Sequence, residues 1–217
     1  MAQYTLVIGN KAYSSWSLRP WLAMKHAGIA FDEMRIPLYQ GDYQAQIAKY
    51  SRAGKVPVLV AGEVAVWDSM AICEYLAEHH PRLQLWPADG AARAYARSIS
   101  AEMHSGFQAL RSNMGMNVRR SFPGVGMTAE VKRDIARIEE IWDQGLNRYG
   151  GPFLCGAFSI ADAMYAPVAT RFETFAVTLS ATARKYTDML LALPAMRDWY
   201  SAAYAETEVL AQYERQH

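Results

Sequence analysis

Short apolar runs alternate with amphipathic stretches over the first 80 residues of the chain. Residues 4–8 are apolar and partly β-branched, which predicts a buried strand. Gly9-Asn10 breaks that run, and the helical pattern that follows ends at Gly28. Further elements are expected at residues 31–36 (strand), 41–51 (weak helix or loop), 56–60 and 64–67 (a hairpin) and 69–79 (helix).

This order of elements predicts a small mixed sheet. The strands at 4–8 and 31–36 are joined through a helix, so they should run parallel with a right-handed crossover. The strands at 56–60 and 64–67 must run antiparallel, because only a short turn joins them. The first 80 residues are therefore expected to form an α/β unit, with helices on the faces of a four-stranded sheet.

Beyond Pro81 the pattern is helical throughout. Prolines stand at both ends of residues 81–87, which suggests a linker. Helices are expected at 91–116, 128–150, 159–175, 185–193 and 194–205. We therefore expect an α/β domain at residues 1–80, a linker at 81–90 and an all-α domain at 91–217.

Composition and charge remove several classes of function. Lys and Arg number 22 against 21 Asp and Glu, and a net charge of +1 offers no electrostatic attraction for nucleic acid or an anionic membrane. No apolar run approaches the ~20 residues that span a bilayer, and no signal peptide is visible. Cys73 and Cys155 have apolar neighbours and are expected to be buried free thiols, and the histidines lack metal-ligand spacing. These features predict a soluble, cytoplasmic protein without a metal.

A cluster of serines stands where the first strand gives way to the first helix. Ser14, Ser15 and Ser17 place three hydroxyls within four residues. A helix N-terminus presents unpaired N–H groups and a partial positive charge, so it can bind an anion and lower the pKa of a thiol. The alternative is that one serine is simply the N-cap of the helix.

Two further motifs lie at the ends of elements in the same sheet. The residue before Pro57 is held extended, which leaves the N–H and C=O of Val56 free to pair with an extended ligand. A cis Val56–Pro57 bond would turn this edge outward, although spacing alone favours trans. Asp68-Ser69 begins a helix: either it caps that helix, or Ser69 receives a carboxylate while Asp68 pairs with an ammonium group.

Together these motifs resemble the glutathione transferase family. The residues that carry the resemblance are Ser14-Ser15-Trp16-Ser17-Leu18-Arg19, Gly54-Lys55-Val56-Pro57-Val58-Leu59, Asp68-Ser69-Met70-Ala71-Ile72-Cys73-Glu74-Tyr75-Leu76 and Ser159-Ile160-Ala161-Asp162. The last of these is similar to the family's buried capping box, and a structural role is favoured for it. The Ser-Ser-x-Ser-x-Arg pattern is most similar to the zeta class, which includes maleylacetoacetate isomerases.

The resemblance implies a thioredoxin-like N-terminal domain that binds glutathione, followed by an all-α C-terminal domain. Ser14 would be the first choice to stabilise the glutathione thiolate, with Ser15 the second. The implied glutathione-binding residues are Lys55 (glycyl end), Val56 beside a cis Pro57 (cysteinyl backbone), Asp68 and Ser69 (γ-glutamyl end) and Gln108 from the second domain. Serines also stand where thioredoxin-like oxidoreductases carry a cysteine, so dithiol exchange is not expected.

The pocket for the acceptor substrate is expected from Trp16, Arg19, Met103, Phe107 and Arg111. Arg19 and Arg111 would suit an acidic acceptor, although a plain surface position is favoured for Arg111. The chain departs from the zeta pattern at Trp16, where that class has cysteine, and at Asp68, where glutamate or glutamine is usual. The bulky indole changes the mouth of the pocket.

No functional role is predicted for His104, and Arg119-Arg120 is expected to be a solvated pair. The expected function is glutathione transfer to a small electrophile, with cis–trans isomerisation of the maleylacetoacetate type as a further activity. The alternative is a non-catalytic member that acts in protein interaction or ligand carriage, and a peroxidase side activity cannot be separated from transfer. The family resemblance also implies a homodimer.

Overall fold

A computed structural model describes residues 3–214 of the chain. Four strands form one mixed sheet in the order β2-β1-β3-β4, with β1 parallel to β2 and antiparallel to β3, and β3 antiparallel to β4. The strands are β1 (Thr5–Ile8), β2 (Asp32–Arg35), β3 (Val58–Ala61) and β4 (Val64–Trp67). The predicted mixed four-stranded sheet is confirmed.

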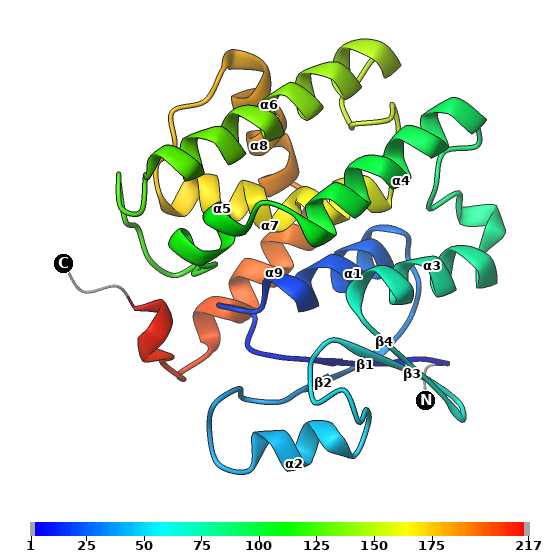
Figure 1. Ribbon diagram of the computed structural model, residues 1–217. Helices are drawn as coiled ribbons and strands as arrows, with labels where there is room; N and C mark the ends of the chain where they lie inside the picture. The colour runs from blue at the N-terminus through cyan, green and yellow to red at the C-terminus, as the bar shows by residue number, and fades with distance from the viewer. Residues whose placement is uncertain (1–2, 215–217) are drawn as a thin grey trace.

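Helices cover both faces of this sheet (Figure 1). The helices of this half are α1 (Ser15–His26), α2 (Tyr43–Ala48) and α3 (Ser69–His79). Alternation along β1 sends Leu6 and Ile8 into the large core beneath α1 and α3, while Val7 joins Val58 and Ile47 in a small core beneath α2. The weak pattern at 41–51 therefore becomes a short helix held by one buried residue, Ile47.

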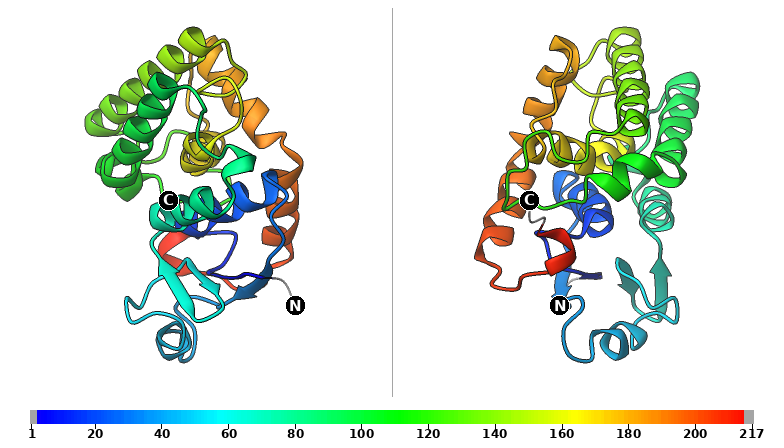
Figure 2. Two further views of the ribbon diagram at one scale, coloured as in Figure 1. Left: turned by 90° about the vertical axis from the view of Figure 1, so that its right-hand side faces the viewer. Right: turned by 60° about the vertical axis from the view of Figure 1, so that its left-hand side comes forward.

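The rest of the described chain is helical. After a 3-10 turn, η1 (Pro81–Leu83), it forms α4 (Gly90–Ser105), α5 (Gln108–Asn113), α6 (Ala129–Tyr149), α7 (Ile160–Thr174), α8 (Ala181–Leu191), α9 (Pro194–Ala205) and the 3-10 turn η2 (Ala211–Tyr213). Almost every residue of α7 is buried, because this helix packs against α1, α4 and α8. Figure 2 shows α7 above α1, so this pair joins the two halves.

The expected capping box at the start of α7 is present. The Asp162 carboxylate is fully buried and accepts hydrogen bonds from the Ser159 N–H (2.8 Å) and hydroxyl (3.2 Å). It also accepts from the Leu154 N–H at 3.0 Å and from the Tyr186 hydroxyl at 2.8 Å. Four donors thus fasten the helix start to the preceding loop and to α8.

Two predicted helices differ from the structure. The single helix expected at 91–116 is broken: α4 ends at Ser105, Gly106 follows, and Phe107 adopts a left-handed conformation with φ of 57°. A Cβ on Gly106 would lie 2.8 Å from the Glu102 carbonyl oxygen, so glycine permits the break. The helix expected at 185–193 begins earlier, because the Ser180 hydroxyl caps it, and it ends at Leu191 ahead of the Pro194 that opens α9.

The segment after α9 returns to the first turn of the chain. The Glu206 carboxylate accepts hydrogen bonds from the backbone N–H groups of Lys11 (2.6 Å) and Ala12 (3.1 Å). The Trp199 indole in α9 donates to the Lys11 carbonyl at 2.9 Å. The turn between β1 and α1 is therefore held from the far end of the sequence.

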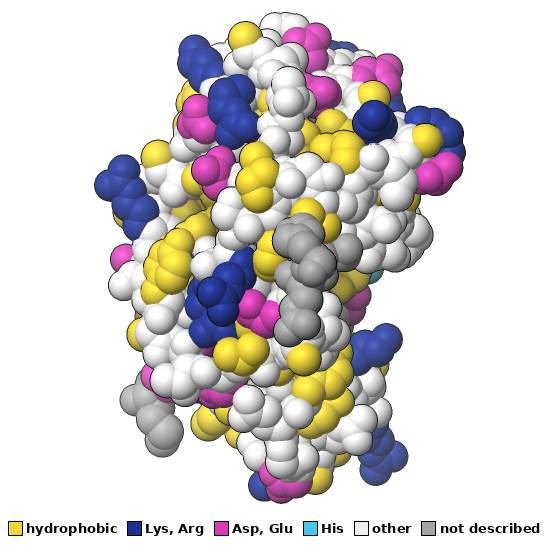
Figure 3. Space-filling model, turned by 90° about the vertical axis from the view of Figure 1, so that its left-hand side faces the viewer, with side chains coloured by type: hydrophobic (Ala, Val, Ile, Leu, Met, Phe, Trp, Pro, Cys, Tyr) yellow, Lys and Arg dark blue, Asp and Glu magenta, His cyan; other side chains and the backbone are white. Residues whose placement is uncertain are grey.

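The described surface shows the balance of charge expected from composition. Basic and acidic side chains are interspersed on the face drawn in Figure 3. Within residues 3–214, no helix is long and apolar enough to cross a membrane. Cys73 is buried as expected, whereas Cys155 is partly exposed rather than buried.

Candidate functional site

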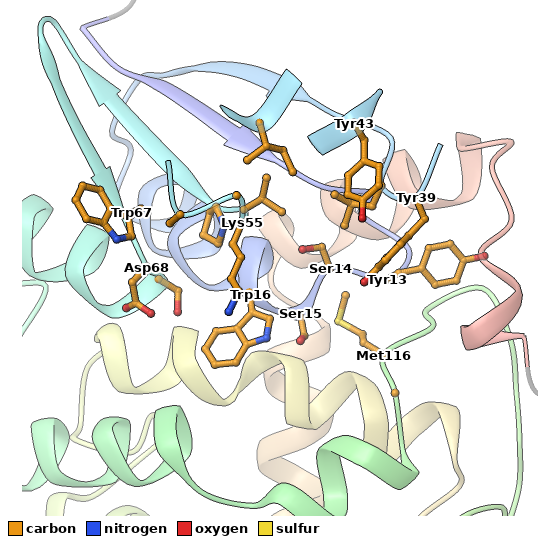
Figure 4. A pocket seen from close by; sticks show the side chains of 18 of the residues that line it. Tyr13, Ser14, Ser15, Trp16, Tyr39, Tyr43, Lys55, Trp67, Asp68 and Met116 are labelled. Carbon is orange, nitrogen blue, oxygen red and sulfur yellow. The ribbon is translucent and has the colours of Figure 1, made fainter. Parts of the chain in front are cut away.

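A cleft of about 840 Å³ lies where the sheet meets the helical half (Figure 4). Its walls come from the turn after β1, the segment around α2, the turn before β3, the junction of β4 and α3, and the helical half. The lining residues are Tyr13, Ser14, Ser15, Trp16, Leu38, Tyr39, Tyr43, Ile47, Ala53, Gly54, Lys55, Val56, Pro57, Trp67, Asp68, Ser69, Arg111, Gly115, Met116, Arg171 and Tyr213. Eight of the predicted site residues, from distant parts of the sequence, therefore meet on one cavity: Ser14, Ser15, Trp16, Lys55, Val56, Asp68, Ser69 and Arg111.

The serine cluster begins α1 at the wall of the cleft. Ser14 is the N-cap: its Oγ accepts from the Ser17 N–H at 3.3 Å and lies 2.7 Å from the Ser17 Oγ, to which it donates. The Ser17 Oγ also accepts from the Gly9 N–H at 3.1 Å. Gly9 is needed here because a Cβ would lie 2.6 Å from Leu38. Ser14 is thus both a cap, as the alternative interpretation required, and a residue that lines the cleft.

The segment before β3 brings Lys55, Val56 and Pro57 to the wall of the cleft. The Val56–Pro57 peptide bond is cis, against the preference that spacing alone indicates and as the family resemblance implies. Val56 is partly exposed, and the exposed Lys55 side chain extends into the cleft (Figure 4). A cationic side chain and the partly exposed Val56 therefore line the cleft next to each other, which suits a peptide-like ligand with a carboxylate.

Asp68 and Ser69 begin α3 at the opposite end of the cleft. Asp68 has a φ of 75°, and its Oδ1 caps the helix by accepting from the N–H groups of Met70 (2.8 Å) and Ala71 (3.3 Å). Ser69 is buried, and its Oγ accepts from a guanidinium nitrogen of Arg19 at 3.4 Å. The capping interpretation of Asp68 is therefore correct, and its second carboxylate oxygen remains for other partners.

The second Asp68 oxygen contacts His104, a residue for which no role is predicted from the sequence. The Nε2 of His104, in α4, lies 3.2 Å from the Asp68 Oδ2. Burial lowers the pKa of His104 below its ordinary value, while the Asp68 charge opposes that shift. No local motif around His104 marks it, because the contact depends on how α4 packs against α3.

Trp16 lines the cleft and is in contact with two arginine side chains. The guanidinium groups of Arg19 and Arg111 lie 4.1 Å and 4.9 Å from the centroid of the Trp16 ring. The His104 ring meets Trp16 edge-on, with 5.3 Å between the two ring centroids. Such contacts are attractive because the aromatic face is electron-rich. The indole therefore contacts one cation that lines the cleft, Arg111, and one that is buried, Arg19.

Four residues expected at the site lie elsewhere. Arg19 is fully buried behind Trp16, and Met103 and Phe107 are packed into the core. Gln108 is exposed and donates to the Ser105 carbonyl. Phe107 and Gln108 lie away from the cleft because the helix breaks at Phe107, which changes the face on which this residue and the next one stand.

Arg171 is a site residue that the sequence analysis missed. Its side chain lies in the buried helix α7, lines the cleft and donates to the carbonyls of Met114 (2.8 Å) and Pro167 (2.9 Å). Burial lowers its pKa to about 9, and the nearby Arg111 charge acts in the same direction. An arginine within a run as apolar as residues 160–175 is the signal that could have found it.

Arg111 and Arg119 are also more engaged than expected. Arg111 is partly buried, lines the cleft and donates to the carbonyls of Met103, Gly106 and His104. Arg119 is not solvated: it donates to the Tyr13 hydroxyl and to two carbonyls of the C-terminal segment. Only Arg120 is as exposed as predicted.

The buried charges around the cleft are mostly positive. Burial lowers the pKa of Arg19 well below its usual range, and the charges of Arg111 and Arg171 add to that effect. Among residues 3–214, the Nε and one terminal nitrogen of Arg19 have no hydrogen-bond partner. No group of three or more His, Cys, Asp or Glu that could hold a metal occurs in the same described range. The chemistry available is thus recognition of an anion next to a helix N-terminus.

Comparison with known protein families gives the same answer for both halves. Residues 13–79 match the glutathione S-transferase N-terminal domain, and residues 91–202 match the glutathione S-transferase C-terminal domain. The chain belongs to the glutathione S-transferase family. The predicted resemblance is confirmed.

Curated glutathione S-transferase relatives point to one part of the family. A probable maleylacetoacetate isomerase of Caenorhabditis elegans is 35% identical over 98 residues, which cover 45% of each chain. Maleylacetoacetate isomerase of Rattus norvegicus is 29% identical over 170 residues and 76% of each chain. Glutathione S-transferase Z1 of Arabidopsis thaliana is 33% identical over 45% of this chain and 47% of that one. The chain thus spans less than half the length of several of these relatives.

Solved structures confirm the glutathione transferase fold. A glutathione transferase homolog from Burkholderia gl BGR1 with bound glutathione has a TM-score of 0.72 at 22% identity, and covers 94% of this chain and 99% of that one. Ure2p in complex with glutathione has a TM-score of 0.70 at 17% identity, with 91% and 98% covered.

Proposed function

We propose that this glutathione S-transferase binds glutathione in the cleft as a thiolate and adds it to a small, acidic electrophile. One observation carries the proposal: the serine cluster, the segment that holds Val56 and the Asp-Ser helix start line the same cavity. Glutathione carries a thiol, a peptide backbone, an ammonium group and two carboxylates, so each feature has a chemical counterpart in the ligand. The bound glutathione of the Burkholderia homolog supports this choice of ligand.

The orientation of the ligand follows from the chemistry of the two ends. Ser14, or Ser15 beside it, would donate to the sulfur, and the N-terminus of α1 would add its partial positive charge. The Val56 backbone would pair with the cysteinyl residue. Asp68 and Ser69 would hold the γ-glutamyl ammonium and carboxylate, and Lys55 would hold the glycyl carboxylate.

The charge of the remaining wall favours an acidic acceptor. Arg111 and Arg171 line the cleft, and neither forms a salt bridge among the described residues. A buried cation without a carboxylate partner is costly, and an anionic substrate would offset that cost. We therefore assign the acceptor carboxylate to the Arg171 side of the cleft.

An acceptor with a conjugated cis double bond could be isomerised. The thiolate adds to one alkene carbon and the electron pair moves to the carbonyl oxygen, which gives an enolate. The former double bond is now single and rotates; the enolate then reforms the double bond as trans and expels the thiolate. Arginine side chains would stabilise the enolate charge. The names of the C. elegans and rat relatives support this activity.

The test measures binding and turnover in the same preparation. Calorimetric titration with glutathione should give one site per chain, and turnover should be faster with a maleyl-type acid than with a neutral aromatic electrophile. Ser14→Ala and Ser15→Ala identify the sulfur ligand. Absence of glutathione binding would refute the proposal, and binding without turnover of any electrophile would favour ligand carriage instead.

A further inference from the structure

Ser17 is a buried hydroxyl one turn behind the cleft wall. Its side chain is fully buried, and its Oγ lies between the Gly9 N–H, at 3.1 Å, and the Ser14 Oγ, at 2.7 Å. Ser14 in turn lines the cleft. A continuous hydrogen-bonded chain therefore runs from the backbone at the end of β1, through Ser17, to Ser14.

The hydrogen bond between Ser17 and Ser14 can run in either direction, because each hydroxyl has one proton. A serine hydroxyl donates one hydrogen bond and accepts up to two. When Ser14 donates to Ser17, its proton points away from the cleft. When Ser17 donates to Ser14, the Ser14 oxygen accepts from both the hydroxyl and the N–H of Ser17, and the Ser14 proton is free to face the cleft. An anion in the cleft favours the second arrangement.

We propose that Ser17 is a positioning residue that directs the Ser14 hydroxyl onto the glutathione sulfur. This inference rests on the proposed function. The bound thiol releases its proton to water, and neither serine takes it up. Ser17 then donates to Ser14 and Ser14 donates to the thiolate, and each bond of such a chain strengthens the next.

The same geometry separates Ser14 from Ser15. The Ser15 hydroxyl makes no side-chain hydrogen bond within residues 3–214, so nothing in that range fixes its direction. Ser14 has a buried partner that can only act through it, because Ser17 itself is closed off from the cleft. The structure thus assigns the sulfur contact to Ser14 and the supporting contact to Ser17.

The experiment measures the pKa of the bound glutathione thiol from the ultraviolet absorption of the thiolate as a function of pH. Ser17→Ala should raise this pKa by about one unit, since hydrogen bonds to charged groups are worth on the order of one to two pKa units. Ser100→Ala, which removes another fully buried serine hydroxyl outside the cleft, is the matched control and should leave the pKa unchanged. Thermal unfolding confirms that each variant is folded.

A double-mutant cycle tests whether Ser17 acts through Ser14. In a Ser14→Ala background, Ser17→Ala should add less than about a third of its effect in the wild-type background. Equal shifts in both backgrounds, or no shift in the single variant, would overturn the proposal. Ser17→Cys keeps the volume with a weak donor, and it takes the place of Ser17→Ala if the alanine variant does not fold.

The thiol pKa of glutathione bound to the wild type tests the proposed function separately from the role of Ser17. A wild-type thiol pKa below that of free glutathione supports the proposed function whatever Ser17→Ala does. If the wild type binds glutathione without lowering its thiol pKa, both the serine mechanism and the role of Ser17 are wrong.

Discussion

The Nε2 atom of His104 lies 3.2 Å from the Asp68 Oδ2, and this contact joins the helical half to the N-terminus of α3. The other oxygen of the same carboxylate caps that helix through the N–H groups of Met70 and Ala71. Asp68 is therefore held from two sides in an unfavourable backbone conformation, with φ of 75°. His104 orients the group that we assign to the glutathione ammonium.

His104→Phe should weaken glutathione binding while leaving turnover at saturating glutathione nearly unchanged. Phenylalanine keeps the edge-on contact with Trp16 but removes the hydrogen bond to Asp68. The pair is partly exposed, so we expect a loss of about two- to fivefold in affinity, measured by calorimetry. His79→Phe, at an exposed histidine outside the cleft, is the control. An unchanged dissociation constant for His104→Phe would show that Asp68 needs no support from α4.

Arg171→Met should raise the KM for an acidic acceptor by roughly ten- to a hundredfold, because the substrate carboxylate loses a charged hydrogen bond in a buried site. The KM for a neutral electrophile should change much less, and this split separates loss of the charge from loss of the fold. Arg133→Met, at an exposed position of α6, serves as the control for the charge change. Equal losses with both kinds of acceptor would contradict the placement of the carboxylate at Arg171.

Arg19→Met should leave the free protein at least as stable as the wild type and reduce the stabilisation that glutathione adds. Arg19 is buried with two unpartnered guanidinium nitrogens, so its replacement by an apolar side chain of similar length should raise the unfolding temperature of the free protein or leave it unchanged. The cation stands behind Ser69, where we place the γ-glutamyl carboxylate. The increase in unfolding temperature on adding glutathione should therefore shrink. A variant that is strongly destabilised without glutathione would show that Arg19 already has an adequate environment.

Asp162→Ala should harm folding more than glutathione affinity. The substitution removes the acceptor for four donors, among them the Leu154 N–H and the Tyr186 hydroxyl, at a site distant from the cleft walls. We expect a loss of about 3 kcal/mol or more in the free energy of unfolding, measured in urea. Unchanged thermal stability would contradict this structural role.

The free energy of unfolding should depend on pH through the titration of Asp162. Burial raises the pKa of Asp162 to about 6, although its donors oppose the rise. A carboxyl with a raised pKa in the folded state stabilises most below its unfolded pKa, and this contribution is lost as the pH rises through 6. Asp162→Asn does not titrate, so the wild type should lose about 2 kcal/mol relative to it between pH 4 and pH 7. A constant difference across this range would mean that the donors hold the carboxylate ionised throughout.

The parts of the site that could be predicted are those fixed by neighbouring residues. Ser14 is a cap because of its own position at a helix start, and Asp68 is a cap for the same reason. Val56 lies at the cleft wall directly before Pro57, and the proline itself restricts the backbone of the residue that precedes it. Such conformations depend on a few consecutive residues, so the pattern alone places these groups at the ends of strands and helices.

The parts that could not be predicted depend on packing between distant segments. His104 reaches Asp68 from α4, and Arg171 reaches the cleft from α7, across long separations in sequence. Phe107 and Gln108 were misplaced because the pattern of 91–116 continues through Gly106 without a visible interruption. The positive φ of Phe107 is enough to place Phe107 and Gln108 away from the cleft wall where they were expected.

The contact of Glu206 with Lys11 and Ala12 sets an order on the assembly of the site during synthesis. The turn that precedes Ser14 is synthesised well before the carboxylate that holds its amides, because Glu206 follows Lys11 by 195 residues. A nascent chain that contains all of β1–β4 therefore still lacks the carboxylate that holds the Lys11 and Ala12 amides. A chain truncated before Glu206 would keep the residues that we propose to contact glutathione but would lack the carboxylate that braces the turn before them.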